Sequence, residues 1–257
     1  FPTRRSSDLA VVARQVEAGS DWIKLMATGG VFTPGSRPSA VQFDDEALAT
    51  VVAAARREGR PVAAHCHGTA GIAAALRAGV RTIEHASFAG AGGFGTDLDE
   101  ALVRELAASE VWVSPTVNAG WLRRVKNADG EPTDFFRRMG RALGRQRELG
   151  VRFVASTDAG IPGVFHHELA GALAAFAAFA GLRPVEVLRT ATADAALALG
   201  IAGETGRIAP GLSADLVVLR EDPTTDLAAL RDPERVLARG VWFAREGVAS
   251  AVPMSKA

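Results

Sequence analysis

The chain has 257 residues, 48% of them hydrophobic, so it can bury a substantial core and form one large domain or two smaller ones. Its 29 basic residues balance its 29 acidic residues, which leaves no charge excess that would favour nucleic acid or an acidic membrane surface as a partner. The single cysteine, Cys66, excludes an internal disulfide framework and a cysteine-based zinc cluster, and no run of 18 apolar residues predicts a membrane span.

The first nine residues, FPTRRSSDL, show no helical or strand period and no signal-peptide pattern. Codons for this stretch can be chosen that match the end of a common DNA sequencing adapter. We therefore predict that residues 1–9 are adapter-derived and that the natural protein continues upstream. A disordered natural terminus is the alternative. We expect a cytoplasmic location, and a signal peptide upstream of Phe1 stays open.

Five short apolar runs follow, and helical segments rich in Ala, Leu and Arg alternate with them. The predicted strands are residues 21–28, 60–67, 81–87, 111–117 and 152–160. The predicted helices are residues 44–59, 70–79, 97–109, 134–150 and 166–181. Several helices stop at Gly, as a C-terminal cap requires. The alternation indicates parallel strands, buried on both faces and joined by helical crossovers.

Polar residues gather at the carboxyl ends of these apolar strands. This favours an α/β fold of the (β/α) barrel type, whose active site lies at that end, over a doubly wound sheet, because no glycine-rich phosphate fingerprint follows any strand. Five strands cannot close a TIM (β/α)8 barrel, so we predict a partial barrel, with strands 4–8 present, over residues 10–200. Short strands with Gly and Pro turns predict that residues 201–257 form the C-terminal part of a small β-sandwich domain.

Four side chains at the strand ends are candidates for chemistry. Residues of like parity share one face of a strand, so Lys24 and His65 each lie on a defined face, and His85 shares its face with Ile83. If each of these faces points toward the barrel axis, Lys24, His65, His85 and Asp158 converge at one mouth of the barrel. Such a set is unusual for a hydrophobic core.

Imidazole nitrogens and a carboxylate suit zinc or a similar divalent ion, which lowers the pKa of a bound water to about 7. An ammonium group beside them would repel the metal. The conflict disappears if burial lowers the pKa of Lys24, because the free amine can then add carbon dioxide. The resulting carbamate is an anionic oxygen ligand that can bridge two ions.

The segments that carry these residues resemble the amidohydrolase superfamily, in particular its prolidase-like branch of metal-dependent dipeptidases related to imidazolonepropionase. They are DWIKLMATGG, VAAHCHG, GVRTIEHASF, ASTDAG and GRIAPGLSADLVVL. The resemblance covers residues 10 to 250, approximately, and the order Lys, His, His, Asp is quite specific. It implies a carboxylated, bridging Lys24, metal ligands at His65 and His85, and an Asp158 that is both ligand and proton shuttle. It also implies two divalent ions, expected to be Zn²⁺.

One departure from the family's pattern concerns its His-x-His pair on strand one, which this sequence lacks. The pair His65 and His67 does not replace it, because these residues follow the lysine strand instead of preceding it. The departure agrees with N-terminal truncation. We therefore expect that this fragment by itself does not assemble a complete two-metal site and is inactive.

Three further residues are candidates for binding the substrate. His67 points the same way as His65 but lies one layer higher, so it either contacts the substrate or faces solvent. The backbone amides of Gly29 and Gly30 could bind a substrate carboxylate, and a plain flexible turn is the alternative. Cys66 has the opposite parity and is expected to be a small packing residue.

The predicted function is metal-dependent hydrolysis of an amide bond, in a dipeptide according to the resemblance. A metal-bridging hydroxide oriented by Asp158 attacks the carbonyl, and Asp158 passes the proton to the leaving nitrogen. A cyclic amide, as in imidazolonepropionase, is the enzymatic alternative, although that relative uses one metal and no carboxylated lysine. Phosphotriesters and lactones also stay open, as do an inactive truncated fragment and a homo-oligomeric state. A small molecule is the expected partner.

Overall fold

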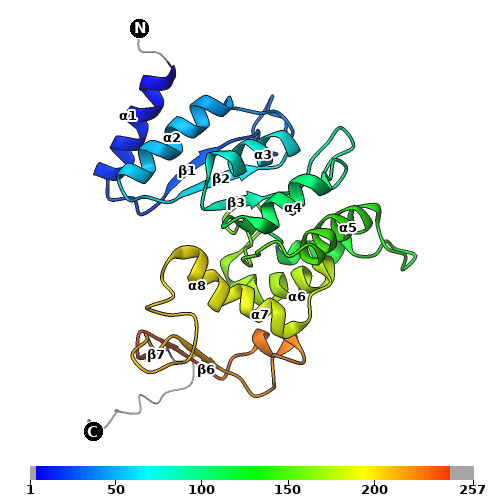
Figure 1. Cartoon of the computed structure of the whole chain (residues 1–257). Helices are drawn as coiled ribbons and strands as arrows, with labels where there is room; N and C mark the ends of the chain where they lie inside the picture. The colour runs from blue at the N-terminus through cyan, green and yellow to red at the C-terminus, as the bar shows by residue number, and fades with distance from the viewer. Residues whose placement is uncertain (1–3, 244–257) are drawn as a thin grey trace.

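The computed structural model describes residues 4–243, and its fold is α/β (Figure 1). A parallel sheet contains, in spatial and chain order, β1 (Ile23–Met26), β2 (Val62–Cys66), β3 (Thr82–His85) and β4 (Trp112–Ser114). Each pair of neighbouring strands is parallel, and a helix lies between them in the chain. These are the repeating strand and helix units of the predicted partial barrel.

The helices begin and end at residues whose chemistry caps them. Asp44 accepts a hydrogen bond from the Ala47 amide at 2.7 Å and so starts α2. Gly79 adopts the left-handed conformation that ends α3. The helices after α1 are α2 (Asp45–Arg57), α3 (Thr69–Ala78), α4 (Glu100–Ala108), α5 (Asp134–Glu148), α6 (Leu169–Ala180), α7 (Pro184–Ala191) and α8 (Ala193–Leu199). Within residues 4–243, none of the helices has the length and apolar character needed to cross a membrane.

The first helix, α1 (Arg4–Glu17), corrects the expectation that residues 1–9 have no regular period. Val12 is buried, and Leu9 and Val16 pack against the core, on the face that meets α2. This spacing of three and four residues is helical, but it becomes visible only when Leu9 is taken together with the residues after it. The adapter origin of residues 1–9 stays a prediction.

The fifth predicted strand, residues 152–160, is only a single parallel bridge between Val113 and Phe153. The Val154 amide still donates to the Val113 carbonyl at 2.9 Å. Pro115, which is the next β4-side residue of the same parity as Val113, has no backbone N–H, so the ladder ends there. The Thr116 amide donates to the Ser156 hydroxyl at 2.9 Å. The segment therefore runs beside β4 as predicted, but its backbone pairing stops after one bridge.

The two faces of β1 differ, contrary to the expectation that every strand is buried on both. Ile23 and Leu25 are buried, whereas Lys24 and Met26 are exposed. β1 lies at one edge of the sheet as described. The central strand β2 carries buried residues along almost its whole length, as a parallel strand with covered faces should.

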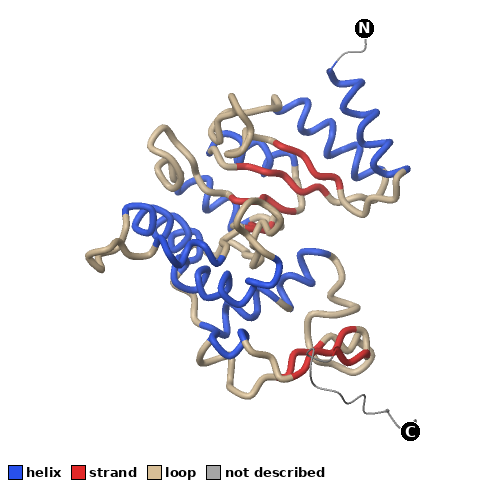
Figure 2. The backbone as a smooth tube through the Cα atoms, turned by 180° about the vertical axis from the view of Figure 1, so that it is seen from behind, coloured by secondary structure: helices blue, strands red, loops and turns tan. Residues whose placement is uncertain are grey.

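An antiparallel sheet follows the last helix. It contains β5 (Leu216–Val218), β6 (Arg235–Ala238) and β7 (Val241–Phe243). Arg239 and Gly240 both have positive φ, which makes the β6–β7 turn the type I′ hairpin that matches strand twist. Helices lie between this sheet and the parallel sheet (Figure 2). Residues 244–257 of the predicted second domain lie outside the described residues, and the domain boundaries stay a prediction.

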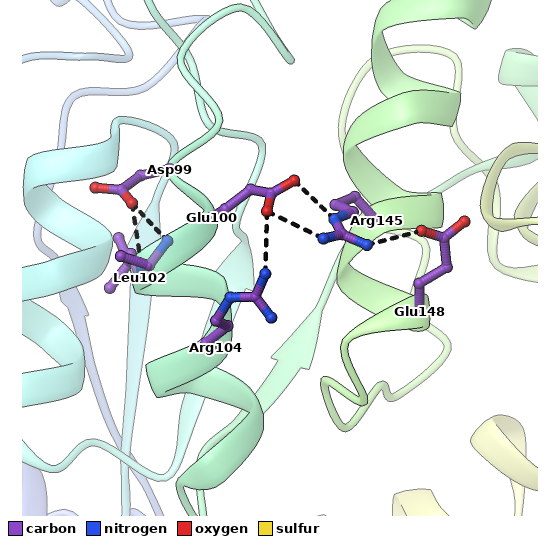
Figure 3. A network of polar contacts seen from close by, with 7 residues as sticks. Asp99, Glu100, Leu102, Arg104, Arg145 and Glu148 are labelled. Carbon is purple, nitrogen blue, oxygen red and sulfur yellow. Dashed lines mark hydrogen bonds and ion pairs between the residues drawn. The ribbon is translucent and has the colours of Figure 1, made fainter.

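A polar network joins α4 to α5 on the surface (Figure 3). Both guanidinium nitrogens of Arg145 that face Glu100 bind its carboxylate, at 2.8 and 3.0 Å, and Arg104 and Glu148 extend the network. This contact lowers the pKa of Glu100. The carboxylate also lies in the first turn of α4, next to the capping residue Asp99, where negative charge is favourable. Because the pair is exposed, its contribution to stability is modest.

Two glycines should respond oppositely to alanine. Gly144 lies inside α5, and an added Cβ would meet no atom within 4 Å, so Gly144→Ala should raise the free energy of unfolding by about 0.5–1 kcal/mol. Gly79 has φ +74°, and Gly79→Ala should lower the free energy of unfolding by about 1–2 kcal/mol because its Cβ clashes in the left-handed region. Urea unfolding measures both changes, and equal changes would contradict these helix bounds.

Candidate metal site at the carboxyl ends of the strands

Three histidines meet where β2 and β3 end. His65 lies in β2, His67 follows it, and His85 is the last residue of β3. The Nδ1 atom of His65 lies 2.9 Å from the Nε2 atom of His85. One ligand atom from each of the three rings lies within 4.8 Å of the others, so the three form a group that could hold a metal ion. The structure thus brings together His65 and His85, two of the four residues that were predicted to converge.

His85 reaches this place by a route that strand parity did not predict. In the sheet register Glu84 lies beside His65, and His85 lies beside Cys66, so Glu84 shares the face of His65. Ile83 is fully buried and does not share that face. His85 itself has φ +70° and Ala86 has φ +41°, and this left-handed backbone turns the imidazole toward His65. The expectation that Ile83 lies on the same face as His65 was therefore wrong, although His85 does contact its predicted partner His65.

The outer nitrogens of the two central imidazoles have partners of different kinds. The Nε2 atom of His65 lies 3.1 Å from the Gly29 carbonyl. A carbonyl only accepts, so this nitrogen carries the hydrogen, and Nδ1 of neutral His65 presents a lone pair. The Nδ1 atom of His85 lies 2.7 Å from the Thr116 hydroxyl. Metal-binding imidazoles usually have their second nitrogen held in this way, so the donor set fits a divalent ion.

His67 is buried rather than facing solvent, which removes one of the two alternatives for it. Its ring is stacked between His85, at a centroid distance of 4.2 Å, and Phe94, at 4.9 Å. Its Nδ1 atom lies 2.9 Å from the Ser87 hydroxyl, and its backbone amide donates to the Thr28 hydroxyl at 2.9 Å. The ring is thus fixed beside the pair formed by His65 and His85.

Burial keeps the three imidazoles neutral. Together with smaller effects from the neighbouring His67, His65 and Lys24, it lowers the pKa of His85 to about 2. Burial also lowers the pKa of His67 to about 3, with a smaller effect from His65. For His65, burial lowers the pKa, while the Gly29 carbonyl and Asp158 oppose that shift. Neutral imidazoles have the free lone pair that metal binding requires.

Lys24 and Asp158 lie close enough to the histidines to act on them electrostatically. Lys24 acts electrostatically on His65 and His85, and Asp158 acts on His65. Lys24 is exposed on the open face of β1, so the described residues do not supply the burial from which carboxylation was argued. Asp158 has φ +57°, and this turn follows the single bridge of its segment. Their roles as ligands stay predictions.

The two glycines after β1 have a different role from the predicted one. The Gly29 amide donates to the Ala40 carbonyl at 2.9 Å, and the Gly30 amide donates to the Ser36 hydroxyl at 3.0 Å. Both amides are therefore occupied within the loop and are not available to a substrate carboxylate. Gly29 is required for another reason, because an added Cβ would lie 2.3 Å from the Arg37 carbonyl oxygen. The Gly29 carbonyl accepts the hydrogen bond from Nε2 of His65.

Sequence reasoning missed the polar residues at the carboxyl end of β4. The run VWVSPTV offered no metal ligand, yet Ser114 and Thr116 lie at the same end of the sheet as the histidines. Thr116 binds His85 and has φ +53°. A β-branched residue in this region costs about 1–2 kcal/mol. The available signal was the position of these hydroxyls at the end of a buried strand and directly after it.

Comparisons with known proteins identify the family. Residues 3–242 match the family model described as Amidohydrolase family. The chain belongs to the amidohydrolase family. This amidohydrolase chain is 31% identical over 234 residues to the ochratoxinase of Aspergillus niger, a match that covers 88% of the chain and 46% of that relative. The chain thus spans about half the length of this curated relative.

Two solved structures have the same fold. A Xaa-Pro dipeptidase with methionine bound in its active site has a TM-score of 0.80 and 26% identity, covering 94% of this chain and 59% of that one. A prolidase complexed with N-methylphosphonate-L-proline has a TM-score of 0.78 and 28% identity, covering 95% and 60%. The predicted resemblance to prolidase-like amidohydrolases and the predicted fold class are confirmed.

The buried histidines should make the stability of the metal-free chain depend on pH. Folding lowers the pKa of His67 to about 3 and that of His85 to about 2, so the unfolded state binds protons first as the pH falls. The stabilisation is complete above pH 6.5, approximately, and is lost as the pH falls toward 3, by at most about 1.4 kcal/mol per pH unit for each imidazole.

Urea unfolding between pH 7.5 and 4 checks this expectation. His67→Gln should reduce the slope of stability against pH, whereas His166→Gln, which removes an exposed histidine, should leave it unchanged. A slope that is the same in both variants would contradict the burial of His67.

Proposed function

We propose that the chain is part of a metal-dependent hydrolase that cleaves an amide bond in a small substrate, and that its histidines bind the metal ion. The observation that carries the proposal is the contact between Nδ1 of His65 and Nε2 of His85, at 2.9 Å. Two neutral imidazoles that present nitrogens to one point are suited to share a divalent ion. Membership of the amidohydrolase family supports the same interpretation.

His65 and His85 would hold the metal, with Asp158 and Lys24 completing the set from neighbouring segments. A divalent ion bound there supplies a water of lowered pKa and polarises a substrate carbonyl. Asp158 acts electrostatically on His65, which supports its place beside the reacting atoms. Its carboxylate would take a proton from the attacking water and deliver that proton to the leaving nitrogen.

Lys24 would act as its carbamate, formed when the neutral amine adds carbon dioxide. The carbamate is anionic and would bring the oxygen atoms that bridge two ions, which are expected to be Zn²⁺. Support for this role is its electrostatic action, from β1, on both His65 and His85. Lys24 is exposed within residues 4–243, so the described residues do not supply the burial that favours its carboxylation.

A dipeptide is the proposed substrate, because two of the similar structures are a Xaa-Pro dipeptidase and a prolidase. His67 would contact it, since its ring lies against His85 and is held by Ser87. A cyclic amide is the second candidate, and one metal without a carbamate would favour it. The alternative of an inactive fragment also stays open. We expect a small-molecule partner in each active case, and a homo-oligomer is compatible with them.

Zinc titration of the metal-free chain tests the histidine site. His65→Ala and His85→Ala should each weaken zinc binding by about 100-fold or more, because each removes a ligand atom from the shared point. His166→Gln is the matched control and should bind zinc as the original chain does. Isothermal calorimetry measures the affinities, and unchanged binding by either alanine variant would contradict the site.

Carbon-13 NMR with labelled bicarbonate and zinc tests the lysine. The chain has three lysines, Lys24, Lys126 and Lys256. A carbamate signal should appear, disappear in Lys24→Ala and persist in Lys126→Ala, whose lysine is exposed and remote from the histidines in sequence. A signal that persists in Lys24→Ala would contradict the carbamate.

Hydrolysis of a panel of Xaa-Pro and other dipeptides then separates the active enzyme from the inactive fragment.

A further inference from the structure

Three hydroxyl groups connect His85 to the segment that carries Asp158. The Thr116 hydroxyl lies 2.7 Å from Nδ1 of His85, and the Thr116 amide donates to the Ser156 hydroxyl at 2.9 Å. The Ser114 hydroxyl donates to the same Ser156 oxygen at 2.8 Å. Thr116 is therefore held through its backbone by the neighbouring segment and presents its side chain to His85.

The positions of the hydrogens on the two imidazoles follow from the Gly29 carbonyl, which can only accept a hydrogen bond. The Gly29 carbonyl only accepts, so His65 carries its hydrogen on Nε2 and accepts at Nδ1. With no ion between the rings, Nε2 of His85 must donate to Nδ1 of His65. Neutral His85 then accepts at Nδ1, and the Thr116 hydroxyl donates to it.

A metal ion would require the opposite arrangement at His85 alone. His65 already presents a lone pair at Nδ1, whereas Nε2 of His85 carries the hydrogen that has to leave. The ring keeps one hydrogen if that hydrogen is exchanged to Nδ1. The group at Nδ1 must then accept instead of donate, and a hydroxyl can do either. The imidazole that must change tautomer is thus the one whose partner is a hydroxyl.

We propose that Thr116 is a positioning residue whose hydroxyl changes from donor to acceptor when His85 changes tautomer to present Nε2 to a divalent ion. This inference rests on the proposed function. The backbone of Thr116 supports it, since a β-branched residue at φ +53° is unfavourable and the observed conformation places the hydroxyl on His85. The network through Ser156 maintains that conformation from a neighbouring segment.

Three variants of the 257-residue chain test the proposal. Thr116→Val keeps the shape and the branching but removes the hydroxyl, and it should weaken zinc binding by about 10–100-fold. Thr116→Ser keeps the hydroxyl and should bind zinc within a few-fold of the original chain. Thr190→Val is the matched control, because Thr190 is a buried threonine that donates to the Val187 carbonyl in α7, and it should not change zinc binding.

Nitrogen-15 NMR of the histidine rings provides a readout that does not depend on activity. In the metal-free chain His85 should carry its hydrogen on Nε2, and after zinc is added it should carry it on Nδ1. The Nδ1 signal of metal-free His85 should shift in Thr116→Val and not in Thr116→Ser or Thr190→Val.

The outcomes separate this inference from the proposed function. If the original chain binds zinc and Thr116→Val binds it equally well, or if His85 has the same tautomer with and without zinc, the inference is overturned and the metal site stands. If Thr116→Ser loses as much affinity as Thr116→Val, the hydroxyl is not the cause and the inference is also overturned. If the original chain binds no zinc, the proposed function is contradicted, and the inference that rests on it is overturned as well.

Discussion

The contact between the imidazoles of His65 and His85 is the interaction on which the candidate site depends. It exists because β2 and β3 are parallel neighbours whose carboxyl ends lie at one edge of the sheet. It also needs the left-handed backbone at His85 and Ala86, which turns a ring from the opposite side of the strand toward His65. Strand pairing brings the two residues near each other, and the turn brings their nitrogens to 2.9 Å.

Burial decides the chemical state of this site. The rings of His67 and His85 are packed against each other, and desolvation lowers the pKa of both. Neutral rings keep the lone pairs that a cation needs. The lysine side of the site is different, because Lys24 lies on the exposed face of the edge strand β1. Within residues 4–243 the three histidine rings contact one another, and Lys24 lies open to solvent.

Sequence reasoning found the residues that occupy strand ends and missed those that hold them. His65 and His85 could be predicted because polar residues at the ends of apolar runs stand out. The Gly29 carbonyl could not, because a backbone oxygen has no sequence signal, and the one signal for Thr116 was its position directly after a buried strand. The amides of Gly29 and Gly30 were given a role in binding substrate, but the loop itself uses both.

By itself, the sequence determined the alternation of strands and helices, the caps at Asp44 and Gly79, and the order of the chemically active residues, because these depend on local periodicity and on neighbours in the chain. Only the tertiary structure decided which face each side chain takes. The 152–160 segment makes a single bridge because Pro115 has no backbone N–H to continue the ladder, and His85 leaves its strand parity because of positive φ. Such departures arise from contacts between residues distant in sequence, which no local pattern contains.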